Sequence, residues 1–253
     1  MKRIVLCLLV LLVSFSGFSQ KLNKLGKILI EELPKMPDHR IERINGEYKV
    51  VTDSFVFEGN SYCSLPNGFI TSLEVVDDKK DYIKHYNSEG KLLVTILSDR
   101  IINLKISKNG NKLAFYNTEN IILLNLQNYK IDTLVGSFIY SFTDAEDLIY
   151  YNSENKYIYY KGNRILSESY PNQFIEYKGE VYVVTKQVIY ELNGLNLFPE
   201  YVLKGKFFDA KIINDEFYFV DKIEKRKSEA FTLYKTSDFD KFIMVDKLDE
   251  LNR

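Results

Sequence analysis

The chain has 253 residues, and its 34 lysine and arginine residues nearly balance 35 aspartate and glutamate residues, for a net charge of −1. This balance argues against a general nucleic-acid binder, which needs a concentrated basic surface. Only 12 residues are glycine, and no glycine-rich phosphate loop is present, so the sequence offers no nucleotide-binding motif.

Residues 1–19 have the features of a secretory signal peptide. Two basic residues precede an apolar run of ten, residues 4–13, and the small residues Gly17 and Ser19 match a cleavage site. Ten apolar residues are too few to cross the ~30 Å hydrocarbon core as a helix. We therefore expect an exported protein, periplasmic or secreted, with no membrane span after cleavage. Cys63 is then the only cysteine left, so no internal disulfide can form.

Residues 20–39 are predicted to form a short N-terminal helix and a linker. Apolar residues recur there at helical spacing, and a proline ends the run. Residues 28–30 fit an additional edge strand as the alternative. The residues of the pattern are Leu22, Leu25, Ile28, Leu29, Leu33 and Pro34.

Residues 40–253 carry a faint repeat with a period of about 34 residues, which is typical of a repeat array. Short runs rich in Tyr, Phe, Ile and Val are separated by turn residues, as in successive strands. Turn-like pairs recur at steps of 32, 32, 37, 32 and 36 residues. They are Asn45-Gly46, Asp77-Asp78, Asn109-Gly110, Glu146-Asp147, Lys178-Gly179 and Asn214-Asp215.

The clearest repeat spans residues 101–135 and predicts four antiparallel strands. Alternating apolar residues and the Asn109-Gly110 hairpin signal define its first half. The third strand, residues 121–124, is apolar on both faces, so both faces should be covered. The expected strands are 102–106, 112–117, 121–124 and 129–135.

A four-stranded sheet covered on both faces is what the blade of a β-propeller requires, because each blade packs between two neighbours. Later repeats at 138–169, 173–197 and 208–245 fit the same frame. We therefore expect an all-β fold, a β-propeller of short four-stranded blades over residues 40–253. Six anchors predict six blades; five or seven blades, a barrel and a β-sandwich are the alternatives.

A resemblance to a known family supports this fold. The stretch Ser-Lys-Asn-Gly-Asn-Lys-Leu-Ala-Phe at residues 107–115, followed by the strand at 121–126, resembles the repeat of WD40-like and TolB-like propellers. The chain has no tryptophan, so the Trp-Asp signature of true WD40 repeats is absent. The resemblance implies a propeller fold and assigns no functional residue.

One local motif, Tyr-Asn-Ser/Thr-Glu-Gly/Asn, occurs three times, each time after an expected second strand. Turn chemistry explains it, because Asn and Ser bond local backbone and Gly or Asn accepts a positive φ. Alternatively, the three loops line one rim and bind a cation or a sugar. The candidate binding residues are Asn87, Glu89, Asn117, Glu119, Asn152 and Glu154.

The sequence predicts no catalytic residue, metal ligand or cofactor. Neither histidine, His39 or His85, has a partner at metal-ligand spacing, and no Gly-x-Ser-x-Gly elbow is present. Glycoside hydrolysis needs two carboxylates ~5–9.5 Å apart, and no motif singles out such a pair. Four carboxylates lie in or beside expected strands: Glu74, Glu176, Glu191 and Asp209.

We therefore expect an exported binding or scaffolding propeller without catalytic activity. Its partner would be an unknown protein or glycan, and not a nucleic acid. Two alternatives remain open. One is a carbohydrate-active hydrolase or lyase, which paired carboxylates would favour. The other is an envelope protein-interaction module, which a broad exposed apolar patch would favour.

Overall fold

The computed structural model describes residues 39–52, 55–73, 80–224 and 228–252, and these form strands and connecting segments with no regular helix. The predicted signal peptide and N-terminal helix lie outside the described residues and stay predictions. The chain divides into two compact units. The larger compact unit is Met36–Thr185 with Glu191–Phe198, and the smaller one includes Lys186–Tyr190 and Pro199–Arg253.

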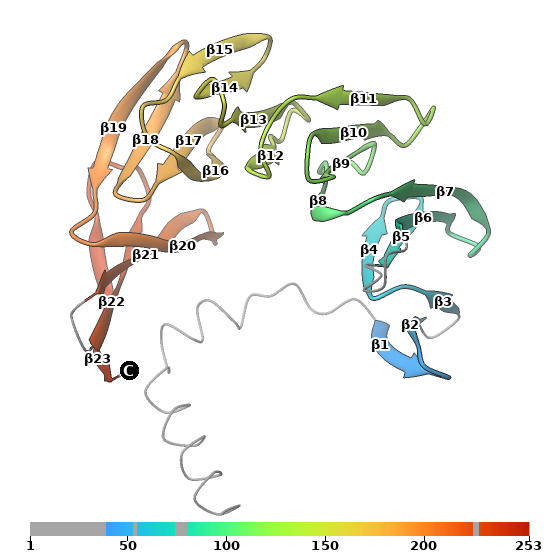
Figure 1. Ribbon diagram of the computed structural model, residues 1–253. Helices are drawn as coiled ribbons and strands as arrows, with labels where there is room; N and C mark the ends of the chain where they lie inside the picture. Colours follow the sequence, from blue (N-terminus) through green and yellow to red (C-terminus); the bar gives the residue numbers. More distant parts are fainter. Residues whose placement is uncertain (1–38, 53–54, 74–79, 225–227, 253) are drawn as a thin grey trace, which may run out of the picture. The chain divides into compact units, whose positions relative to one another are not determined.

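The strands form six antiparallel sheets, each made of strands that follow one another in sequence (Figure 1). The first sheet has three described strands, β1 (His39–Ile44), β2 (Glu47–Thr52) and β3 (Val56–Glu58). The second sheet contains β4 (Ser61–Leu65), β5 (Gly68–Leu73), β6 (Asp81–Asn87) and β7 (Leu92–Ser98). The third sheet contains β8 (Ile102–Ile106), β9 (Lys112–Tyr116), β10 (Ile121–Asn125) and β11 (Ile131–Leu134).

Three further sheets repeat the four-stranded pattern. The fourth sheet contains β12 (Tyr140–Phe142), β13 (Leu148–Asn152), β14 (Tyr157–Tyr160) and β15 (Asn163–Leu166). The fifth contains β16 (Pro171–Tyr177), β17 (Glu180–Thr185), β18 (Val188–Asn193) and β19 (Asn196–Val202). The sixth contains β20 (Lys206–Ile213), β21 (Glu216–Glu224), β22 (Ser228–Thr236) and β23 (Ile243–Asn252).

This architecture confirms the predicted all-β propeller with six short blades. Four of the predicted turn pairs join the first and second strands of a four-stranded sheet, and Asn45-Gly46 joins β1 to β2. The second sheet differs, because its first hairpin turns at Pro66-Asn67 and not at Asp77-Asp78. The pair Asp77-Asp78 falls outside the described residues, in the connection from β5 to β6.

The second and third sheets pack against each other through a buried apolar cluster. Its buried members are Leu65, Ile70, Ile83, Leu113, Phe115, Leu124 and Leu126. Burial of this kind stabilises a fold by about 25 cal/mol for each Å² of apolar surface removed from water. The contact therefore links two sheets that are formed by separate parts of the sequence.

The opposite face of the third sheet packs on the fourth. Ile121 and Leu123 of β10 belong to a cluster that includes Tyr140 and Leu148 of the fourth sheet. Since Leu124, on the other face of β10, joins the first cluster, this strand is covered on both sides. The prediction made from the doubly apolar run at 121–124 is confirmed.

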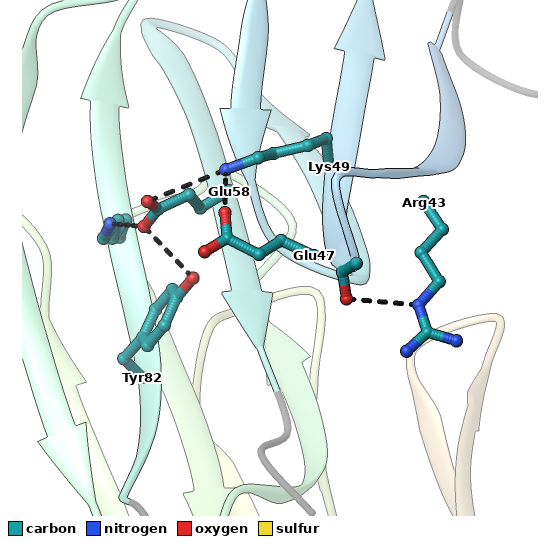
Figure 2. A network of polar contacts seen from close by, with 7 residues as sticks. Arg43, Glu47, Lys49, Glu58 and Tyr82 are labelled. Carbon is teal, nitrogen blue, oxygen red and sulfur yellow. Dashed lines mark hydrogen bonds and ion pairs between the residues drawn. The ribbon is translucent and has the colours of Figure 1, made fainter.

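Polar contacts connect the first and second sheets (Figure 2). The Glu58 carboxylate accepts from Lys84 Nζ at 2.5 Å and from the Tyr82 hydroxyl at 3.4 Å. Lys49 Nζ lies 2.7 Å from Glu47 Oε2 and 3.8 Å from Glu58 Oε1. The hydrogen bond from Lys84 lowers the pKa of Glu58. Because such exposed ion pairs contribute little free energy, this network orients the strands more than it stabilises them.

Within the described ranges, the structure has no helix with the length and hydropathy needed to cross a bilayer.

Candidate binding cleft

A cleft of about 310 Å³ opens between the second and third sheets, inside the larger compact unit. A volume near the lower end of the ~300–1,000 Å³ range of small-molecule sites suits a compact ligand. The cleft forms where the first hairpins of two neighbouring sheets approach each other. Its two walls therefore come from turns more than 40 residues apart in the sequence.

The first wall comes from the second sheet. The turn Pro66-Asn67 joins β4 to β5 and presents the exposed Asn67 amide at the rim. His85 lies on β6, and a bulge next to it leaves Leu93 as an extra residue on β7. Bulges re-aim side chains in this way. Leu93 is 46% exposed and lies at the edge of the cleft.

The second wall begins with the turn from β8 to β9. The Gly110 N–H donates to the Ser107 carbonyl at 2.9 Å, and the Asn111 N–H donates to Asn109 Oδ1 at 2.9 Å. Gly110 has φ of +74°, and a Cβ there would lie 2.7 Å from Pro66 Cδ. Glycine is therefore required both by the turn and by the close approach of the first wall.

The remainder of the second wall is the turn from β10 to β11. Asn125 Oδ1 accepts the Gln127 N–H at 2.9 Å, which fixes the start of this turn. Gln127 Nε2 then donates to Asn111 Oδ1 at 3.0 Å. The Leu126 N–H donates to the Asn111 carbonyl at 2.8 Å. These bonds hold the two turns of the third sheet together as one surface.

A histidine–tyrosine pair joins the two walls. His85 is only 8% exposed, and its Nδ1 lies 3.3 Å from the Tyr129 hydroxyl. Burial lowers the pKa of the His85 imidazole, so the neutral form is favoured at neutral pH. His85 Nε2 makes no hydrogen bond to another described residue, and His85 is one of the residues that line the cleft.

The polar side chains that line the cleft are uncharged. Its polar side chains are amides, one phenol and one neutral imidazole, and none of its lining residues is Asp, Glu, Lys or Arg. Amide, hydroxyl and imidazole groups both donate and accept hydrogen bonds. Such a lining suits an uncharged ligand that carries donors and acceptors side by side.

The His85 environment predicts a pH-dependent stability. In the folded protein the pKa of His85 lies below its ordinary value of 6.5, so below pH 6.5 the unfolded chain binds a proton that the folded chain excludes. The contribution of His85 to the free energy of unfolding is therefore complete above pH 6.5 and is lost as the pH falls below it. We expect urea unfolding between pH 7.5 and 5.5 to show a smaller pH slope for His85→Gln than for the wild type. Equal slopes would contradict this prediction.

The six residues that the sequence singled out do not come together. Asn87 ends the third strand of its sheet, whereas Asn117 follows a second strand and Asn152 ends one. Because successive hairpins of an antiparallel sheet lie at alternate ends, the Asn87 loop belongs to the end that carries the first hairpins. The loops of Asn117 and Asn152 lie at the other end of their sheets. The expectation that all three motifs follow second strands is thus wrong for Asn87.

Each of these asparagines bonds its own loop. Asn87 Oδ1 accepts the Glu89 N–H at 3.1 Å, and Asn117 Oδ1 accepts the Glu119 N–H at 3.2 Å. The corresponding distance from the Glu154 N–H to Asn152 Oδ1 is 2.9 Å. The amide oxygens therefore serve turn formation. A binding role for these residues stays a prediction.

Three of the carboxylates noted beside strands accept hydrogen bonds, two of them from neighbours in sequence and Glu176 from a residue 32 positions away. Glu176 accepts the Asp144 N–H through Oε2, Glu191 Oε1 accepts from Asn193 at 3.2 Å, and Asp209 Oδ1 accepts the Ala210 N–H at 2.8 Å. Glu74 lies outside the described residues. In the part of the chain that is described, no three His, Cys, Asp or Glu side chains are grouped to hold a metal ion.

Sequence reasoning missed the cleft. The sequence shows His85 without a partner at metal-ligand spacing and Asn109 in a hairpin turn, and it assigns a binding role to neither. Residues 125–128 fall between the expected strands 121–124 and 129–135. A usable signal was the density of amides in the 101–135 repeat, where Asn109, Asn111 and Gln127 lie in the two turns at one end of the sheet. The first wall could not be assigned without the position of the Pro66-Asn67 turn.

No family model matches the sequence, and no curated protein is significantly similar to it. Similar solved structures are β-propeller proteins. Hsv2 of Kluyvelomyces marxianus has a TM-score of 0.50 at 9% identity, over 79% of this chain and 92% of that one. Dipeptidyl peptidase 4 of Porphyromonas gingivalis has a TM-score of 0.51 at 9% identity, over 83% of this chain.

This chain spans only 45% of that peptidase. The β-propeller domain of the Trilobed protease from Pyrococcus furiosus has a TM-score of 0.49 at 10% identity, over 84% of this chain and 94% of that one. At such low identity the likenesses to Hsv2 and to dipeptidyl peptidase 4 show the fold alone. By fold the chain is a β-propeller protein, and its function has to be argued from its own residues.

Proposed function

We propose that this protein is an exported, non-catalytic β-propeller that binds an uncharged polar ligand in the cleft between its second and third sheets. One observation carries the proposal. Turns of two neighbouring sheets place uncharged hydrogen-bonding side chains around the buried His85 and the half-buried Tyr129. A concave site with a few convergent polar groups is the usual form of a small-molecule site.

The arrangement suits binding better than chemistry. Acid–base catalysis uses a positioned side chain, most often a histidine and also Asp or Glu. The lining of this cleft has no Asp or Glu, and its one histidine, His85, is paired with Tyr129. The buried imidazole is held by Tyr129 and serves as a hydrogen-bonding group in this proposal. Export rests on the signal-like residues 1–19. Protein recovered from the producing cells should therefore begin at Gln20, and an intact residue 1 on the mature protein would contradict export.

A thermal-shift screen tests the binding proposal. The mature protein is heated with uncharged saccharides, capped peptides and nucleosides, and at least one class should raise its melting temperature by mass action. Gln127→Leu removes an exposed amide at the rim and should abolish the shift. Asn163→Leu, an exposed asparagine on β15, is the matched control and should leave it unchanged.

Three outcomes would contradict the proposal. The first is no shift with any compound class, and the second is a shift that survives in Gln127→Leu. The third is turnover of a bound saccharide or peptide, measured by chromatography of the incubated compound, which would exclude a non-catalytic role.

A further inference from the structure

We infer that the ligand of the cleft is a neutral saccharide unit, an inference that rests on the proposed binding function. The inference begins from the density of hydrogen-bonding groups. Six polar side chains surround a volume of about 310 Å³. They are Asn67, His85, Asn109, Asn111, Gln127 and Tyr129.

The groups left for a ligand are mixed donors and acceptors. Asn109 Oδ1 is taken by the Asn111 N–H, and Asn111 Oδ1 is taken by Gln127 Nε2. The Nδ2 groups of both asparagines then remain as donors, and Gln127 Oε1 remains as an acceptor. The hydroxyl groups of a sugar fit this pattern, because each one donates and accepts.

Apolar groups lie beside these polar ones. Pro66 and Leu93 border the cleft from the first wall, and the Tyr129 ring and Leu126 border it from the second. A sugar ring has apolar C–H faces between its hydroxyl groups, which can pack on such side chains. The half-buried Tyr129 combines both functions, since its ring is apolar and its hydroxyl bonds His85.

An extended peptide fits the same lining less well. It presents one amide group for about every 3.3 Å of its length, alternately to opposite sides. Few of its polar groups would face a compact cleft at one time, and several of the amide side chains would be left unpaired. The absence of charge from the lining residues also disfavours uronic acids and other anions, because nothing in the cleft would balance their charge.

The experiment is a binding titration of the mature protein by calorimetry and saturation-transfer NMR. The probes are D-galactose, N-acetyl-D-glucosamine, maltose and cellobiose, with D-glucuronate and the capped dipeptide acetyl-Ala-Ala-amide as contrasts. At least one neutral saccharide should bind at least tenfold more tightly than glucuronate and the dipeptide. Gln127→Leu and Asn111→Leu should each weaken it at least tenfold, and Asn163→Leu less than twofold.

Each alternative outcome is informative. If the dipeptide binds and Gln127→Leu abolishes its binding while no saccharide binds, the saccharide inference is wrong and the proposed binding function stands. If no probe binds and the wider screen also fails, both are wrong. Saccharide binding that is unchanged in both cleft variants would place the site elsewhere and overturn the inference. Circular dichroism of each variant confirms that it is folded.

Discussion

Replacing Phe115 by alanine is expected to lower the free energy of unfolding by about 3–5 kcal/mol, the usual range for a buried phenylalanine. Phe115 is 1% exposed and belongs to the cluster shared by the second and third sheets. Its loss removes apolar contacts from both sheets at once and leaves a cavity that close-packed strands can fill only in part.

Urea unfolding followed by far-ultraviolet circular dichroism measures this effect. Phe198→Ala is the matched control, because Phe198 is 48% exposed on β19 in the same compact unit. Its free energy of unfolding should change by less than about 0.5 kcal/mol, as for other exposed positions. Equal effects of the two substitutions would show that Phe115 is not buried between packed sheets.

Replacing Asp221 by alanine is expected to have the second large effect, in the smaller compact unit. Asp221 is 1% exposed, and its carboxylate accepts the N–H groups of Lys204 and Gly205, each at 3.0 Å. Burial raises the pKa of Asp221, although these two bonds act to lower it. Alanine would leave two N–H groups unpaired, at a cost of about 1–3 kcal/mol for each one that water cannot reach.

The backbone at residue 205 lies so close to Asp221 and Lys222 that only glycine fits there. A Cβ on Gly205 would lie 2.3 Å from the Lys222 carbonyl and 2.9 Å from Asp221 Oδ1. Asp221→Asn keeps one acceptor oxygen and should destabilise less than Asp221→Ala in urea unfolding. Asp240→Ala, at an exposed position, should have almost no effect. If Asp221→Ala lowered the free energy of unfolding as little as Asp240→Ala, Asp221 would not be the buried acceptor for the Lys204 and Gly205 N–H groups.

Much of the strand pattern is predictable because it is local. The alternation in residues 102–106 and the Asn109-Gly110 turn define β8 and the start of β9, and the structure has both where they were expected. The doubly apolar run at 121–124 also predicted correctly that β10 is covered on both faces. In these cases the side-chain period and the turn residues determine the structure without distant contacts.

Other features depend on context that the sequence does not display. The expected repeat at 173–197 ends at Leu197, and Pro199 follows closely. Yet β19 covers Asn196–Val202 at the end of its sheet, where a strand edge tolerates proline. The Asp77-Asp78 pair matches the spacing of the other turn pairs, but the first hairpin of the second sheet turns at Pro66-Asn67.

The cleft was beyond prediction for the same physical reason. It exists because the Pro66-Asn67 turn meets the Gly110 turn, and no local pattern reports a contact between hairpins of separate sheets. The Tyr-Asn motifs were conspicuous because they repeat, but repetition reflects the chemistry of hairpins. The candidate site instead uses Asn109, Asn111 and Gln127, which belong to no repeated motif.

A crystal structure of the protein soaked with the tightest-binding neutral saccharide tests the central claim most directly. We predict density for one sugar ring within hydrogen-bonding distance of Asn111 Nδ2 and His85 Nε2, with a C–H face against Tyr129. Density at the Asn117 and Asn152 loops, with the space between the Pro66 and Gly110 turns filled only by water, would contradict it.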